Sequence, residues 1–154
     1  MTTSRARLVL SSADLSEAIE YMEALMAPEA AAWPDVVRRA LEVSAVVSYA
    51  RPFSGNQNEA GKKERVAVGD YVTDAQGVAL HGQAITLRDT LLAHTDFSAK
   101  PNDGPHADTS VTVTLSVTLY DPLDDPLDIP GLLRLARSIR ERMDRQRAIV
   151  IPQP

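Results

Sequence analysis

Proline residues divide this chain of 154 residues into segments of helical length. A proline inside a helix removes a backbone hydrogen bond and clashes with the preceding turn, whereas at the first helical position it is well tolerated. Between the prolines, apolar residues recur at spacings of three and four, which is typical of amphipathic helices. The pattern therefore predicts four helices, over residues 14–27, 34–51, 74–94 and from Pro130 toward the C-terminus.

The segment Val111–Tyr120 has a different period, because five apolar residues alternate with five polar residues. Strict alternation predicts a strand with one buried face, and such a strand needs a neighbour for its backbone hydrogen bonds. Arg5–Ser11 alternates in the same way and is the first candidate, followed by Arg65–Val72. We therefore expect a mainly α fold, an up-and-down four-helix bundle with a small antiparallel β appendage in which residues 111–120 pair with 5–11.

The length and composition exclude several kinds of site and of partner. The length predicts a single domain over residues 1–154. The absence of cysteine excludes disulfides, thiolate zinc sites and a cysteine nucleophile, and it fits a cytoplasmic location. No apolar run reaches the ~18 residues of a membrane span, so we expect no membrane partner. The histidines, His81, His94 and His106, lack the framework of a metal site, and we expect neither a metal nor another cofactor.

The net charge of −5 is distributed unevenly along the chain. Residues 130–154 hold six arginines against two acidic residues and so carry +4, which leaves −9 on the remainder. An arginine-rich last helix can bind RNA locally, form a contact between copies of the chain, or simply present a solvated face. The sequence leaves these three alternatives open.

The third predicted helix carries the side chains best suited to acid–base chemistry and phosphate binding. His81 and Arg88 are seven residues apart and share one face of an α-helix. Arg88 and His94 are six residues apart, which places them about 120° from each other around the helix axis. They converge only if the helix unwinds near Ala93 or if a second copy of the chain supplies one of them.

The pattern of Arg88, Asp89 and His94 resembles the signature of the HEPN superfamily, in which an arginine and a polar residue are followed by a histidine four to six residues further on. The order of segments over 15–96 is similar as well, with a second helix that ends in Tyr-Ala-Arg-Pro-Phe at 49–53 and a long loop before the motif helix. The resemblance implies a helical domain that cleaves RNA without a metal ion. Its arginine and histidine side chains would be paired at the cleft of a homodimer.

On this interpretation the chain is a candidate ribonuclease of the toxin or defence type. Arg88 would hold the scissile phosphate, His94 would transfer a proton, and Asp89 would orient one of these two side chains. The expected partners are RNA, a second copy of the chain, and a cognate antitoxin or another protein. Further candidates for the binding site are Arg51, His81 and Asp96.

A second interpretation needs no catalysis. Arg88 can form a structural ion pair with a nearby carboxylate such as Asp96, and His94 can stabilise the C-terminus of the helix, where a cation is favourable by about 0.3–1 kcal/mol. The chain would then be a non-catalytic HEPN-like binding or protein-interaction module. Its arginine-rich C-terminal helix would be the contact surface.

Overall fold

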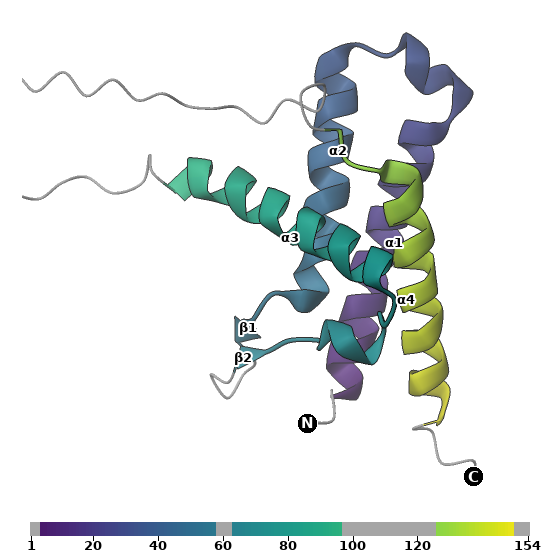
Figure 1. Ribbon diagram of the computed structural model, residues 1–154, viewed down its shortest axis with the longest axis vertical. Coiled ribbons are helices and arrows are strands. Elements are labelled where there is room, and N and C mark those ends of the chain that lie inside the picture. Colours follow the sequence, from purple (N-terminus) through teal and green to yellow (C-terminus); the bar gives the residue numbers. More distant parts are fainter. Residues whose placement is uncertain (1–3, 58–62, 97–125, 150–154) are drawn as a thin grey trace, which may run out of the picture.

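The computed structural model describes residues 4–57, 63–96 and 126–149, and α-helices dominate these residues (Figure 1). The expected order of four helices is confirmed within the described part of the chain. Pro34, which was predicted to be the first residue of the second helix, stands directly before it as the N-cap. The helices are α1 (Arg5–Met26), α2 (Asp35–Ala50), α3 (Ala75–Asp96) and α4 (Ile129–Ile149).

The predicted β appendage is the main correction. Residues Arg5–Ser11 form the first turns of α1 rather than a strand, because the hydroxyl of Ser4 caps the helix by accepting a backbone hydrogen bond. The alternation was misleading, since Leu8 is buried but Leu10 is 60% exposed. Pairing of residues 5–11 with the predicted strand 111–120 is therefore wrong, and 111–120 itself lies outside the described residues.

Short 3₁₀ helices and a small hairpin connect the α-helices where the structure describes the connections. The 3₁₀ helices cover Pro28–Ala32, Arg51–Phe53 and Val68–Asp70. The hairpin pairs β1 (Asn56–Gln57) with β2 (Lys63–Glu64) in antiparallel register. The second candidate strand, Arg65–Val72, is also wrong, because a 3₁₀ helix occupies its centre.

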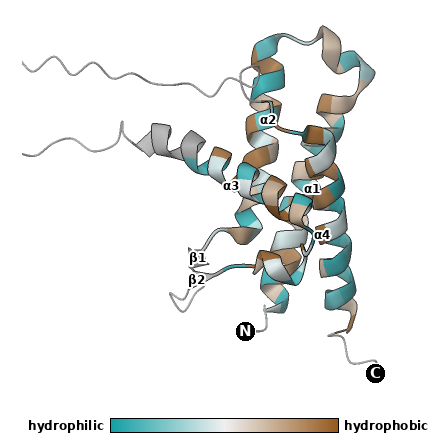
Figure 2. Cartoon of the chain, in the orientation of Figure 1, coloured by the Kyte–Doolittle hydropathy of each residue, from teal (hydrophilic) through white to brown (hydrophobic). Residues whose placement is uncertain are grey.

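Helices α1, α2 and α4 form the core. α1 packs against both of the others, and Figure 1 shows that it runs antiparallel to each. In Figure 2 the visible outer side of α4 is mostly hydrophilic, as expected for an amphipathic helix with its apolar side inward. These helices supply most of the large, fully buried side chains, namely Leu8, Leu15, Met22, Val46, Tyr49, Leu132, Ile139 and Met143.

Helix α3 is arranged differently. It crosses the other helices obliquely, and its C-terminal half extends beyond α2 (Figure 1). Its N-terminal half approaches α4, where Leu80 lies close to the backbone of Gly131. A helical bundle is therefore confirmed, but α3 does not run alongside the other three helices.

The same local sequence, Asp-x-x-Gly, begins both α3 and α4. Asp74 accepts a hydrogen bond from the backbone N–H of Gly77 at 2.7 Å, and Asp128 accepts one from Gly131 at 2.8 Å. A side chain at residue 131 would overlap the Asp128 carboxylate, and one at residue 77 would come within 2.9 Å of the Asp74 carboxylate. Glycine at these positions therefore lets the aspartate satisfy a backbone N–H group that the helix leaves free.

Candidate functional site

Arg88 and Asp89 form an ion pair in the C-terminal half of α3. The Nη1 group of Arg88 donates a hydrogen bond to Oδ1 of Asp89 at 2.7 Å. The Arg88 side chain is 26% exposed and that of Asp89 is 60% exposed. Asp89 is the only partner of Arg88 among the described residues, and this contact uses the Nη1 group, one part of a guanidinium that has five N–H donors. The structure thus brings together two of the three predicted catalytic residues.

His94 and Asp96 lie in the last turns of α3, in a stretch for which the structure describes only the backbone. That backbone is a continuous α-helix through Ala93, so the helix does not unwind there. Positions 88 and 94 of one chain therefore lie about 120° apart around the axis, because each residue turns an α-helix by about 100°. One of the two conditions under which Arg88 and His94 could converge is thereby excluded.

His81 lies at the contact of α3 with the end of α2. Its Nδ1 atom is 3.1 Å from the hydroxyl of Tyr49, and its ring stands edge-on to that of Phe53, with centroids 4.6 Å apart. Burial lowers the pKa of His81 below its usual range and raises that of the fully buried Tyr49. His81 shares a helix face with Arg88, as predicted from the spacing, but it is directed toward aromatic residues of the bundle.

Arg51 is held in a polar cluster between α1 and α2. Its Nη1 group lies 2.6 Å from Oε2 of Glu17 and 3.6 Å from Oδ1 of Asp14. The same Glu17 carboxylate accepts hydrogen bonds from Ser48 at 2.7 Å and from Tyr21 at 3.1 Å. Arg51 is 47% exposed, yet its charge already faces two carboxylates, so binding a phosphate would require it to give up these contacts.

The pKa values of the two carboxylates in this cluster are shifted in opposite directions. The hydrogen bond from Ser48 is the main cause that lowers the pKa of Glu17. Burial raises the pKa of Asp14, and this effect exceeds the opposing attraction of Arg51. The cluster therefore stabilises the charged form of one carboxylate and disfavours that of its neighbour one turn away.

Arg7 is a buried residue that the sequence did not single out. Its Nη2 group donates to the backbone carbonyls of Arg51, Pro52 and Ser54, at 2.9, 2.8 and 3.3 Å. These carbonyls follow the end of α2, where a helix leaves acceptors unpaired. Pro52 predicts where α2 ends, and so predicts that unpaired carbonyl groups lie there. The residue that donates hydrogen bonds to them, Arg7, lies 45 positions earlier in the sequence and could not be predicted from this pattern.

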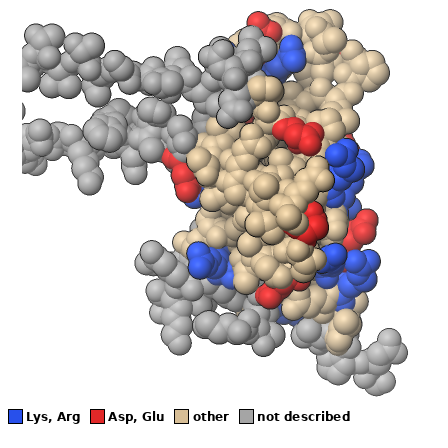
Figure 3. Space-filling model, in the orientation of Figure 1, with Lys and Arg blue, Asp and Glu red and all other residues tan. Residues whose placement is uncertain are grey.

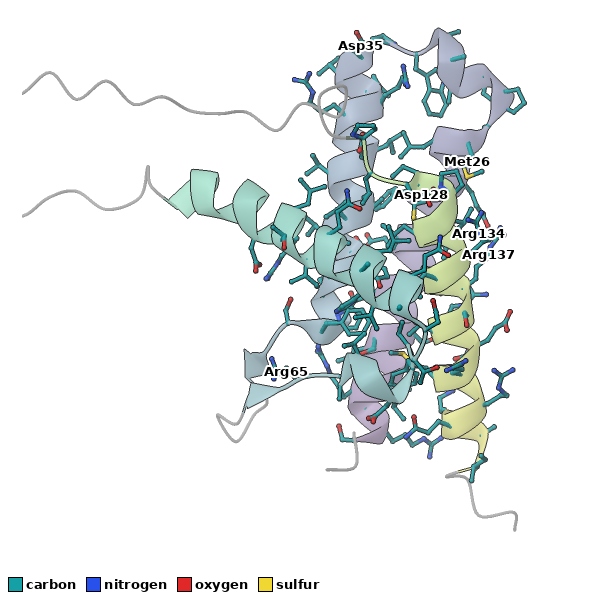
Figure 4. The ribbon with its side chains drawn as sticks, in the orientation of Figure 1. Met26, Asp35, Arg65, Asp128, Arg134 and Arg137 are labelled. Carbon is teal, nitrogen blue, oxygen red and sulfur yellow. The ribbon has the colours of Figure 1, made fainter. Side chains whose placement is uncertain are left out.

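Three of the six arginines of α4 bind other parts of the chain. Figure 3 shows basic and acidic side chains interspersed along the side of the molecule formed by α4, and Figure 4 shows Arg134 and Arg137 directed outward. Arg134 and Arg145 make no ion pair with another described residue. The others have described partners: Arg137 binds Glu23, Arg140 binds Ser16, Arg142 binds the carbonyl of Tyr71, and Arg147 pairs with Asp144.

Comparisons with known proteins add no relative to this description, since no family model, no curated protein and no solved structure matches the chain. In the described residues, no group of three or more histidine, aspartate or glutamate side chains is placed to hold a metal ion. None of the described helices is both long enough and apolar enough to cross a membrane.

Proposed function

We propose that this chain acts on RNA through Arg88 and His94 of α3, as a metal-independent endoribonuclease of the toxin or defence type. The main support for the proposal is the exposure of Arg88 and the small number of its contacts. Its guanidinium is partly exposed, and within the described structure it binds only the adjacent Asp89 carboxylate. Arg7, Arg51 and Arg142, by contrast, are engaged with other segments of the fold.

The chemistry of these residues suits cleavage of a phosphodiester. An exposed ion pair such as Arg88–Asp89 is worth at most about 1 kcal/mol, so a phosphate can replace the carboxylate at little cost. The guanidinium can then bind two phosphate oxygens and stabilise the charge that develops on them. His94, in its neutral form, can take the proton of a ribose 2′-hydroxyl, a step typically worth ~10²–10⁴ in rate.

The proposal includes a homodimer. Because α3 stays helical through Ala93, Arg88 and His94 of one chain diverge around the helix axis. The arginine of one protomer would therefore meet the histidine of the other. The part of α3 that extends beyond α2 is the segment that would form this contact (Figure 1).

The test is cleavage of total RNA by the purified protein in the presence of EDTA. We expect cleavage by the parent chain and none by Arg88→Ala or His94→Ala, with both variants still folded by circular dichroism. Arg88→Lys should not restore activity, because an ammonium group cannot reproduce the planar two-point grip on phosphate. Cleavage that requires magnesium, or that persists in His94→Ala, would contradict the proposal.

Mixing the two inactive variants tests the composite site. In an equimolar, re-equilibrated mixture half of the dimers contain one copy of each variant, and each such dimer holds one intact Arg88–His94 pair across the interface. We expect about a quarter of the parent activity to return. If the mixture stays inactive while the parent chain is active, Arg88 and His94 act within one chain and the dimeric arrangement is wrong.

The alternative function, a non-catalytic interaction module that uses α4 as its contact surface, has less support. Four of the six arginines in this region have described partners within the chain, and three of these partners lie on other elements. Arg134 and Arg145 are the side chains of α4 best placed to bind a partner. Their substitution by alanine should leave RNA cleavage unchanged if α3 is the active helix.

A further inference from the structure

The attachment of α3 to the rest of the molecule depends on few contacts. Of the α3 side chains that the structure describes, over residues 75–89, Ala84 is the only fully buried one. Leu80, Ile85 and Leu87 are partly buried against the core. Because few of its described side chains are buried, the loss of a single polar contact with α2 should weaken the attachment of this helix measurably.

That polar contact is the pair formed by Tyr49 and His81. Tyr49 is fully buried, and His81 is the only hydrogen-bond partner of its hydroxyl among the described residues. If Nδ1 of His81 carried the proton, the hydroxyl hydrogen of Tyr49 would have no described acceptor. We therefore assign the imidazole proton to Nε2, so that Tyr49 donates to Nδ1, and the Phe53 ring packs against the same imidazole.

We propose that this pair is an acid-sensitive joint, in which protonation of His81 releases α3 from α2. A protonated imidazole carries a hydrogen on both ring nitrogens, so Nδ1 can no longer accept from Tyr49. The tyrosine hydroxyl would have to turn and accept instead, which leaves its own buried hydrogen without a partner. The new positive charge would also be partly buried against two aromatic rings. Burial penalises such a charge, and no carboxylate in the described part of the chain compensates it.

The groups around His81 determine whether acid favours or opposes the release of α3. Tyr49 is the titratable residue that faces it from α2, and the 3₁₀ helix Arg51–Phe53 contributes the uncharged Phe53. Burial lowers the pKa of His81, and no charged side chain among the described residues contributes to this shift. The docked helix thus binds protons less readily than the released helix, so release becomes more favourable as the pH falls below the ordinary histidine value of about 6.5.

The joint also concerns the proposed site, because α3 carries Arg88 and His94. Release of α3 would change their position relative to a second copy of the chain, a consequence that rests on the proposed function. The joint itself does not rest on it, because it can be measured on the protein alone, without RNA.

Hydrogen exchange followed by mass spectrometry tests the joint. The protection of α3 peptides is compared at pH 7.5 and pH 5.5 after correction for the intrinsic exchange rate, with α1 and α4 peptides as internal references. We expect α3 to lose protection at the lower pH by up to about tenfold, because pH 5.5 lies one unit below the ordinary histidine pKa of about 6.5. The reference peptides should keep their protection.

Two matched substitutions identify the responsible histidine. His81→Asn places a carbonyl oxygen near the position of Nδ1 and cannot be protonated in this range, so α3 should become insensitive to pH. His94→Asn removes the other histidine of the same helix and should leave the response unchanged. If α3 protection in the parent chain does not depend on pH, or if the response persists in His81→Asn, the joint is overturned.

A third variant covers the case in which His81→Asn weakens the fold. Tyr49→Phe removes only the hydroxyl, so it should lower α3 protection at pH 7.5 while α1 and α4 stay protected. Equal protection of α3 in Tyr49→Phe and the parent chain at pH 7.5 would show that the hydrogen bond does not hold the helix, and would also overturn the proposal.

Discussion

The three helices α1, α2 and α4 and the single helix α3 are stabilised in different ways. The first group shares a core in which Leu15, Met22, Ile139 and Met143 are fully buried. Helix α3 has one buried side chain in its described part and extends beyond the others at its C-terminal end (Figure 1). The segments that form a stable scaffold are thus separate from the segment that carries the candidate catalytic residues.

This difference has a physical reason. A helix packed on several sides buries apolar surface at roughly 25 cal/mol per Å², so its position is fixed by many contacts. A helix that leaves one end free retains backbone and side-chain groups that can meet another molecule. Binding and catalytic groups are often placed on such segments of lower local stability.

The largest expected effect is the difference in stability between a substitution in the core and one on α3. Leu15→Ala removes a fully buried side chain from the centre of α1 and should lower the free energy of unfolding by about 2–5 kcal/mol, as measured by urea denaturation. Val78→Ala on α3 is the control, because Val78 is 49% exposed, and it should change stability by no more than about 0.5 kcal/mol. Similar losses in the two variants would remove the distinction between core and α3.

A second prediction compares two glycines at helical positions. Gly131→Ala places a methyl group against the capping carboxylate of Asp128 and within 3.1 Å of Leu80, so it should destabilise the protein by about 1–3 kcal/mol. Gly82→Ala on α3 meets no atom within 4 Å and should stabilise the helix by about 0.5–1 kcal/mol. Thermal unfolding of both variants measures the contrast, and a stabilised Gly131→Ala would show that α3 does not pack closely on α4.

The smallest expected effect concerns the pH dependence of the scaffold. Glu17 has a lowered pKa in the folded protein, so its stabilising contribution is lost as the pH falls through that value. Asp14 has a raised pKa, so acid removes a penalty and its contribution has the opposite sign. We expect Glu17→Gln to make the loss of stability between pH 6 and pH 3 shallower and Asp14→Asn to make it steeper, as followed by urea denaturation.

If either variant changed the slope in the opposite direction, the pKa values of Glu17 and Asp14 would not be shifted in the directions described above. A change confined to these carboxylates should not alter the hydrogen exchange of α3. This separates their titration from that of His81.

Much of the helical architecture could be predicted because prolines and apolar spacing act locally. Pro34 and Pro52 limit α2 to nearly its observed length, and Asp74 precedes α3 as a helix cap. Residues 5–11 were assigned wrongly because seven residues are too few to distinguish a period of two from a period of 3.6 when the exposed face also carries leucine. The buried serines and Arg7 in α1 gave no apolar pattern that would have corrected the error.

The candidate site was predictable only in part. The spacing of Arg88 and His94 is visible in the sequence, and so is their angular separation on a helix. The contact of His81 with Tyr49 joins residues 32 positions apart, and no local pattern predicts which face of α2 meets α3. The close approach of Leu80 to Gly131 likewise becomes visible only in three dimensions.

The hydrogen bonds of Arg7 have a consequence for the order in which the chain assembles. They join the first turn of α1 to carbonyls at the end of α2, across 45 residues of sequence, and so close the α1–α2 hairpin at its open end. The acceptors come into position only when α2 has formed and has aligned antiparallel to α1, so this closure belongs to the late stages of hairpin formation. Loss of the Arg7 guanidinium should therefore raise the rate of unfolding more than it lowers the rate of folding.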